Sequence, residues 1–434
     1  MLPTLDPAPP DVSVLVLGAG MAGLSCADLL HRAGYRVTVL EAQRRAGGRV
    51  HTLREEFSEG LHVEAGANRF PDCHPLTLAC CNRLGLELVD FQHPDLPQVC
   101  WLENHRFVMD PARPTRWPVP MAHDEECESP GQLEGRYIGP WLDRLGDPLA
   151  SDWPPERYRH LDGQSYADFL RQQGASEGAI AVLSCNFNVG EGLEHASALW
   201  MLRNHALDRD RKRLLEIPGG NDRLPEALAR ELSPILRYGC PVTRIEPLPD
   251  RVRVTIRQAF EPEVLEAHYA VCTLPYPVLK DLDVPLSPAR RRVAEQLPYA
   301  SMTKVFLQCR RRFWEDSGLS GFATTDRPMT EIWNVTVSQS GTRGVLLAYS
   351  GGAESRRLTA MTEELRVSTT LERMAEVYPD LKVHFEGGLS WCWDLDPWSG
   401  GAGAWYGVGQ WLDFQPDLAG PQGRLHFAGE HTSP

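Results

Sequence analysis

Three glycines and one acid near the N-terminus have the spacing that binds a dinucleotide. Gly18, Gly20 and Gly23 follow an apolar run, and Glu41 comes 21 residues after Gly20. Gly18 permits a tight turn, Gly20 lets a pyrophosphate approach bare backbone, and Gly23 lets a helix pack closely on the strand. The helix N-terminus would hold the pyrophosphate, and the carboxylate of Glu41 would accept hydrogen bonds from ribose hydroxyls. A plain strand-to-helix turn is the alternative, but strand, helix and acid in this order favour the dinucleotide site.

A lysine far along the chain is a second residue that could do chemistry. Lys304 lies in the apolar stretch 301–307, where strand alternation places it on the same face as Met302 and Phe306. A lysine between apolar neighbours loses hydration, so it tends to be partnered or functional. The alternative is a lysine at a strand edge, whose stem packs on apolar surface while its ammonium reaches water.

The elements that must position these residues follow from the periodicity of the apolar side chains. The first 50 residues are predicted to form a strand, a helix ending near Gly34, and a parallel strand at 36–40. The stretch 111–155, rich in Pro, Trp, Gly and acids, is predicted as extended loop in which 140–145 could make a short helix. Amphipathic helices are then predicted after Ser165, after Ser176 and across 193–207.

The second half of the chain is predicted to be rich in strands. After residue 235 the apolar period changes to two, which predicts a small antiparallel meander running through 252–256 to a strand at 269–272. A mixed sheet flanked by helices is expected to follow, with strands at 304–308, 331–337 and 345–349 and a helix carrying Val367, Leu371, Met374 and Tyr378 on one face.

Length and charge limit the classes of protein. A chain of 434 residues exceeds what one hydrophobic core usually serves, so two domains are expected. The net charge of -14 argues against binding to nucleic acid or to an anionic membrane surface. No apolar run approaches the roughly 18 residues of a spanning helix, and the first residues lack a basic-then-apolar signal. We therefore expect a cytoplasmic protein without a nucleic-acid or membrane partner, and leave a homodimer open.

The cysteines indicate neither a disulfide framework nor a metal site. There are 11 of them, scattered, and none forms a CxxC pair. Cys73 and His74 are adjacent, and Cys80 and Cys81 follow, but no second ligand pair lies at metal spacing. These residues are interpreted as packing residues, and no metal is expected.

Five further segments matter in combination. They are Gly47-Gly48-Arg49, Gly66-Ala67-Asn68-Arg69-Phe70, Ile217-Pro218-Gly219-Gly220, the Trp- and Gly-rich stretch 391–402, and Leu425-His426-Phe427-Ala428-Gly429-Glu430. In this order they resemble the flavin amine oxidase family, which includes monoamine oxidases, polyamine oxidases and L-amino acid oxidases. The resemblance runs from about residue 12 to residue 434.

The resemblance implies an α/β fold in which a Rossmann-type FAD-binding domain carries an inserted mixed-sheet and helical substrate domain. The expected FAD-binding domain comprises residues 1–75, 210–282 and 385–434, and the substrate domain 76–209 and 283–384. FAD is favoured over NAD because a second arginine-bearing turn and a late acid would both return to the cofactor. Relatives that bind flavin covalently carry a cysteine where this chain has Ala402, so noncovalent FAD is expected.

The resemblance also implies which residues contact FAD. Val242 would lie beside the adenine, with an ordinary core valine as the alternative. The full set of expected contacts is Gly18, Ala19, Gly20, Met21, Ala22, Gly23, Glu41, Ala42, Gly48, Arg49, Gly66, Ala67, Asn68, Arg69, Val242, Trp393, Gly429 and Glu430.

The resemblance also implies a reaction, and it assigns roles in that reaction to Lys304, Arg69 and Trp333. In the family, the lysine at this place holds a water against the flavin. The family's amino acid oxidases carry an arginine in a Gly-Ala-x-Arg segment, and a guanidinium can bind the substrate carboxylate through two hydrogen bonds. Trp333 falls where such enzymes place an aromatic residue. Oxidation of an L-amino acid by oxygen to keto acid, ammonium and hydrogen peroxide is therefore expected. An ordinary ion pair of Arg69, a primary amine or polyamine oxidase, and a catalytically impaired flavin-binding paralogue are the alternatives.

The end of the sequence departs from the family pattern. Family members continue past His431-Thr432-Ser433 into a further turn and helix, whereas this sequence ends at Pro434. Weak FAD binding and slow turnover are expected for a chain truncated there.

Overall fold

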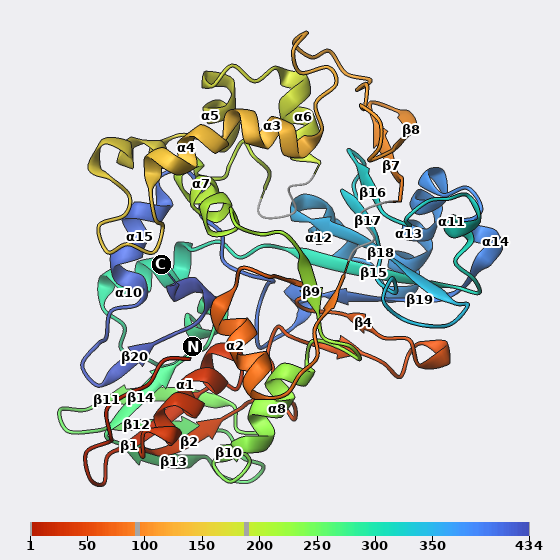
Figure 1. Cartoon of the computed structure of the whole chain (residues 1–434). Coiled ribbons are helices and arrows are strands. Elements are labelled where there is room, and N and C mark those ends of the chain that lie inside the picture. Colours follow the sequence, from red (N-terminus) through yellow and green to blue (C-terminus); the bar gives the residue numbers. More distant parts are fainter. Residues whose placement is uncertain (1, 92–95, 186–190, 434) are drawn as a thin grey trace.

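A five-stranded parallel sheet positions the glycine motif (Figure 1). The computed structural model describes residues 2–91, 96–185 and 191–433. The strand order is β10-β2-β1-β14-β20, with every neighbouring pair parallel. Segments far apart in the sequence therefore build one sheet: β1 (Ser13–Leu17), β2 (Arg36–Leu40), β10 (Leu236–Arg237), β14 (Tyr269–Cys272) and β20 (Leu425–Phe427).

Strand β1 is buried on both faces, and its alternate side chains enter two different cores. Val14 and Val16 pack with the apolar sides of α1 (Met21–Arg32), α2 (Pro75–Arg83) and α8 (Arg223–Glu231). Leu15 and Leu17 pack instead in a second core with residues of the antiparallel meander β11 (Val242–Pro247), β12 (Val252–Ile256) and β13 (Glu263–Ala267). The near-continuous apolar run of β1 is what a parallel strand covered on both faces requires.

One strand pairs differently from the sequence prediction. The meander is confirmed for β11, β12 and β13, but residues 269–272 leave it and form β14, which pairs in parallel with β1 and β20. His268 donates its backbone N–H to the Ser13 carbonyl at 3.1 Å, which starts this pairing. A strand's partner is set by long-range packing, which apolar periodicity does not report.

A seven-stranded sheet forms the second sheet layer, on the right of Figure 1. Residues 385–392, which the sequence assigned to the FAD-binding domain, lie in this sheet because β19 pairs with β15. The predicted strand 331–337 ends at Asn334, whose side chain accepts a hydrogen bond from the Thr336 backbone at 3.2 Å. The order is β19 (Phe385–Cys392), β15 (Met302–Cys309), β18 (Gly344–Gly351), β17 (Glu331–Asn334), β16 (Ala323–Thr325), β7 (Gln98–Leu102) and β8 (His105–Met109).

A group of helices lies at the top of Figure 1, and serine caps set where several of them begin. Ser165, Ser176 and Ser197 each accept a hydrogen bond from the first turn of α5 (Tyr166–Gln172), α6 (Glu177–Ser184) and α7 (Ala198–Leu207). The predicted helix across 193–207 therefore begins only at Ala198.

Part of the stretch predicted as loop is helical. Helix α4 (Gly139–Leu145) agrees with the short helix considered at 140–145, but α3 (Pro130–Tyr137) was not expected. Ser129 and Gln132 form a capping box at its start, and this signal outweighs the Pro and Gly content of the stretch.

The remaining helices and strands complete the fold. Among the described residues, no helix has the length and apolar character needed to cross a membrane, and all 11 cysteines are free. The remaining helices are α9 (Tyr276–Leu279), α10 (Pro288–Gln296), α11 (Phe313–Asp316), α12 (Gly352–Thr359), α13 (Glu363–Val377), α14 (Leu381–His384) and α15 (Gln410–Leu418), and the remaining strands are β3 (Thr52–Leu53), β4 (Val63–Glu64), β5 (Phe70–Pro71), β6 (Val89–Asp90) and β9 (Leu214–Glu216).

Candidate active site

A cleft opens at the carboxyl ends of the parallel strands, where the chain leaves β1, β2, β14 and β20. Ligands of open α/β sheets bind at this edge. Twelve of the residues expected to contact FAD line the cleft: Gly18, Gly20, Met21, Ala22, Glu41, Ala42, Gly48, Arg49, Ala67, Trp393, Gly429 and Glu430. The structure therefore brings together motifs from both ends of the chain.

The glycine turn leaves the first turn of α1 open to a ligand. Gly18 has φ +102°, a conformation that disfavours other residues, and a Cβ on Gly23 would meet the Gly18 carbonyl oxygen at 2.0 Å. The N-cap of α1 is Gly20, which has no side chain to occupy the first backbone N–H groups, and the first helical turn contains no acid. The free backbone N–H groups and the positive end of the helix can therefore receive a pyrophosphate.

Glu41 is fixed at the end of β2 by backbone donors. One carboxylate oxygen accepts the Ala19 N–H at 2.7 Å and the other accepts the Gln43 N–H at 2.8 Å. Burial raises the pKa of Glu41, and these two hydrogen bonds act in the opposite direction. The carboxylate is thus held at the cleft where a ribose would lie.

Arg49 and Glu430 meet across 381 residues of sequence. Arg49 Nη1 donates to Glu430 Oε1 at 2.7 Å and to the Ala402 carbonyl at 3.1 Å, and the Ala404 N–H donates to the same Glu430 oxygen at 3.1 Å. The early Gly-Gly-Arg turn and the late Ala-Gly-Glu segment therefore form one wall of the cleft.

The cleft also contains a donor that a bound cofactor could satisfy. Ser399 lines it and is only 4% exposed, yet its hydroxyl has no hydrogen-bond partner among the described residues. Buried polar groups normally have partners, so this hydroxyl fits contact with a ligand such as the polar parts of FAD. The open helix terminus, the acid of Glu41 and Ser399 together fit an FAD molecule.

Lys304 lies deep between the sheet and the segment that follows β4. Its ammonium donates to the Glu64 carbonyl at 3.0 Å, to the Gly66 carbonyl and to Asn68 Oδ1. Lys304 is 3% exposed and β15 has neighbours on both sides, so the strand-edge alternative is wrong. Burial lowers the pKa of Lys304 to about 7, and raises the pKa of neighbouring Glu64 to about 8. The water-holding role of Lys304 remains a prediction.

Arg69 lies in an aromatic cluster next to this lysine. Its guanidinium stacks 4.0 Å from the centre of the Trp333 ring and 5.3 Å from that of Phe91. Trp333 in turn stacks on Tyr349, with ring centres 4.9 Å apart, and Tyr349 is the cross-strand neighbour of Lys304. Burial lowers the pKa of Arg69, which the charge of Glu331 opposes. Arg69, Trp333 and Lys304 therefore lie in one region, and the substrate-binding roles of Arg69 and Trp333 remain predictions.

Several predicted residues lie beside the cleft rather than on it. Ala19 donates to Glu41, and Gly66 packs so closely that a Cβ there would lie 1.9 Å from the Arg49 carbonyl oxygen. Gly23, Asn68, Arg69 and Val242 are also absent from the cleft lining, and Val242 sits at the start of β11, opposite Ile256.

The sequence reasoning missed three parts of the site. Thr273, Leu274 and Pro275 line the cleft, and they follow β14, so correct pairing of that strand would have located them. Ser399 and Tyr349 give no local signal, because a lone serine in a loop and a lone tyrosine in a strand are common.

Comparisons with known proteins agree on the class of site. Residues 21–434 match the sequence family described as "Flavin containing amine oxidoreductase". A Bacillus subtilis (strain 168) protein named "Putative L-amino-acid oxidase YobN" is 31% identical over 97% of this chain and 90% of its own length. The L-amino-acid oxidase of Echis ocellatus is 29% identical, over 97% of this chain and 84% of its own length.

Two solved structures share the fold. A putrescine oxidase bound to putrescine has a TM-score of 0.81 at 21% identity, covering 99% of this chain and 94% of the other. Cyclohexylamine oxidase from Brevibacterium oxydans IH-35A has a TM-score of 0.78 at 21% identity, covering 98% and 94%. The Rossmann-type α/β architecture predicted from the sequence is thereby confirmed.

Proposed function

The chain belongs to the flavin containing amine oxidoreductase family, and we propose that it oxidises an L-amino acid with noncovalently bound FAD. The environment of Arg69 is the observation that supports an amino acid as the substrate. Its guanidinium is half-buried on the face of Trp333, and although the charge of Glu331 acts on it, no ion pair joins it to an acid among the described residues. A cation that is partly withdrawn from water and has no anion in direct contact is unfavourable, so this site favours a ligand that brings a carboxylate.

Each neighbouring residue has a defined part in this proposal. Arg69 holds the α-carboxylate through two N–H groups, and the flat ring of Trp333 fixes the plane of the guanidinium. Tyr349, half-buried beside Trp333 with its pKa raised to about 12, stays protonated and can donate a hydrogen bond to the same carboxylate. The aromatic surfaces exclude water from the α-carbon. FAD, when bound, supplies the acceptor for the hydride of that carbon.

The overall reaction is the conversion of amino acid, water and oxygen to keto acid, ammonium and hydrogen peroxide. Noncovalent attachment is supported by Ala402, which lines the cleft and offers no thiol to the flavin. The names of the two L-amino-acid oxidase relatives support the substrate class, whereas the two solved amine oxidases are compatible with a simple amine.

The test compares an amino acid with the amine that lacks only its carboxylate. Arg69→Ala should reduce kcat/KM for the amino acid by about 2–4 kcal/mol, the range for leaving a buried charge without its partner. The same substitution should affect the amine far less. Arg327→Ala is the control, because Arg327 also stacks on a tryptophan, 4.7 Å from the centre of the Trp101 ring, but is already paired with Glu376 at 3.2 Å. Equal losses for both substrates, or brisk turnover of amines alone by the parent enzyme, would favour an amine oxidase instead.

A further inference from the structure

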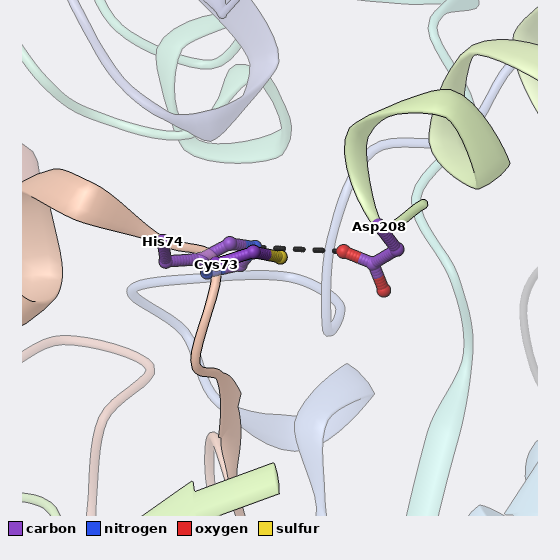
Figure 2. Close-up of side chains that lie close together, drawn as sticks. All are labelled: Cys73, His74 and Asp208. Carbon is purple, nitrogen blue, oxygen red and sulfur yellow. Dashed lines mark ion pairs between the residues drawn. The ribbon is translucent and has the colours of Figure 1, made fainter. Parts of the chain in front are cut away.

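Three metal-ligating side chains converge outside the cleft, although the sequence separates them. Cys73 and His74 directly precede α2, and Asp208 follows the last residue of α7 (Figure 2). One ligand atom from each residue lies within 4.8 Å of the other two. His74 Nε2 and Asp208 Oδ1 are 3.6 Å apart. In the sequence, only Cys73 and His74 could be recognised as neighbouring metal-ligating residues, because Asp208 is 134 residues from His74.

The main chain fixes this convergence independently of the three side chains. Strand β5 pairs with β9, which places Pro71 opposite Leu214. The Asp72 N–H donates to the Arg213 carbonyl at 3.1 Å, and Asp72 Oδ1 accepts the Lys212 N–H at 2.9 Å. The two segments that carry the cluster are therefore held side by side by hydrogen bonds that need no metal.

The ligand atoms are not committed to strong contacts. Cys73 Sγ reaches the Leu207 carbonyl only at 3.8 Å, and His74 and Asp208 form a long ion pair, at 3.6 Å, when the imidazole is protonated. Arg211 pairs at 3.2 Å with Asp208 Oδ2, which leaves Oδ1 directed to His74. With metal bonds of about 2.0–2.3 Å, tetrahedral ligand atoms lie roughly 3.2–3.8 Å apart, so small side-chain rotations would close the site.

We propose that Cys73 Sγ, His74 Nε2 and Asp208 Oδ1 bind one Zn²⁺ ion, with water as the fourth ligand. A sulfur, nitrogen and oxygen donor set suits zinc and disfavours Mg²⁺ or Ca²⁺, which prefer oxygen alone. On binding, the Cys73 S–H bond breaks, a sulfur–zinc bond forms, and the proton leaves to solvent. The ion joins the segment before α2 to the end of α7.

The pH dependence of this binding follows from the thiol. Zinc binds the thiolate and displaces the thiol proton, so affinity should rise as pH rises. Asp208 and Asp72 place negative charge near Cys73, and Arg211 places positive charge there. The two carboxylates attract the ion and Arg211 weakens its binding.

The test uses the FAD-loaded, tag-free protein after chelator treatment, with Zn²⁺ in calorimetry and Co²⁺ in absorption spectroscopy. The parent should bind one equivalent of either ion, and the Co²⁺ form should show tetrahedral bands at wavelengths beyond the flavin absorption. Cys73→Ser and His74→Gln should each weaken Zn²⁺ binding by about tenfold or more. Cys73→Ser should also remove the sulfur contribution from the Co²⁺ spectrum.

The chain supplies matched controls of the same residue types. His123 and Glu126 pair at 3.8 Å and Cys127 is exposed, but these side chains are not among the converging groups of the described residues. His123→Gln and Cys127→Ser should bind Zn²⁺ as the parent does. Variants that keep the parent's flavin content and metal-free Tm report on binding rather than folding. No bound equivalent in the parent, or binding that survives Cys73→Ser and His74→Gln, would overturn the proposal.

Discussion

Replacing Lys304 with methionine should change how the stability of the protein depends on pH. Burial lowers the pKa of Lys304 from 10.5 to about 7 in the folded chain. Between these values the unfolded chain carries a proton that the folded chain lacks, so unfolding takes up a proton. Stability therefore increases with pH in this range, by about 1.4 kcal/mol per pH unit. Methionine cannot titrate, and the variant loses this increase.

The three acceptors around Lys304 add a second, constant effect. The Glu64 and Gly66 carbonyls and Asn68 Oδ1 lose their donor in Lys304→Met. Above about pH 8 the neutral amine has two N–H groups, so two of these acceptors lose a partner in the variant, each at a cost of about 1–3 kcal/mol. The variant should thus be less stable in this range, and the gap to the parent should widen as pH rises.

The window of measurement is set by Glu64, whose pKa burial raises to about 8. A raised carboxyl pKa gives stability that is present below the unfolded value and is lost between about pH 4.5 and pH 8, opposite in sign to Lys304. Above about pH 8.5 that loss is nearly complete. From about pH 8.5 to pH 10, the gap between parent and variant should widen by about 2 kcal/mol, or roughly 2 °C in Tm for a chain of this length.

The assay is thermal unfolding of the FAD-loaded proteins followed by circular dichroism at several pH values in this window. Lys280→Met is the control, because Lys280 is exposed. Its gap to the parent should stay constant. A constant gap for Lys304→Met as well would refute the inference that the folded protein holds this amine neutral above pH 8.

Three further substitutions or treatments test the cofactor and substrate sites. Gly23→Ala places a Cβ 2.0 Å from the Gly18 carbonyl oxygen, so the flavin-to-protein absorbance ratio of this variant should fall sharply. Gly131→Ala is the control, because a Cβ there meets no atom within 4 Å, and its ratio should match that of the parent. Acid precipitation should release all flavin to the supernatant, and flavin in the pellet would contradict noncovalent binding. Trp333→Leu removes the ring that stacks on Arg69, so KM for an amino acid should rise by the equivalent of about 0.5–2 kcal/mol. An unchanged KM would show that Trp333 does not contribute to substrate binding.

Sequence reasoning succeeded where structure is local. The strand, helix and strand of residues 13–40 follow from apolar periodicity and glycine geometry within a short stretch, and the serine caps at Ser165 and Ser176 place two helices. The missed helix α3 also had a local signal, the Ser129 and Gln132 capping box, which the Pro and Gly content obscured. Boundaries and caps could therefore be read from neighbouring residues.

Long-range contacts could not be derived in this way. The Arg49 and Glu430 contact spans 381 residues, and only the resemblance to a family suggested that both would approach one cofactor. The parallel pairing of β14, the partnerless Ser399 hydroxyl and the approach of Asp208 to Cys73 and His74 depend on how distant segments pack. No periodicity within one segment carries that information.

The segment 64–69 explains why cofactor and substrate sites should respond together. The Arg49 carbonyl accepts the Ala67 N–H at 3.1 Å, and Arg49 belongs to the Gly-Gly-Arg turn at 47–49, here called the cofactor turn. The next residue, Asn68, accepts from Lys304, and Arg69 then enters the aromatic cluster. A single short backbone therefore runs from the cleft wall through the buried lysine to the guanidinium. Because Gly66 allows no Cβ beside the Arg49 carbonyl, this segment has little room to shift, and a change that moves the cofactor turn should also move Arg69.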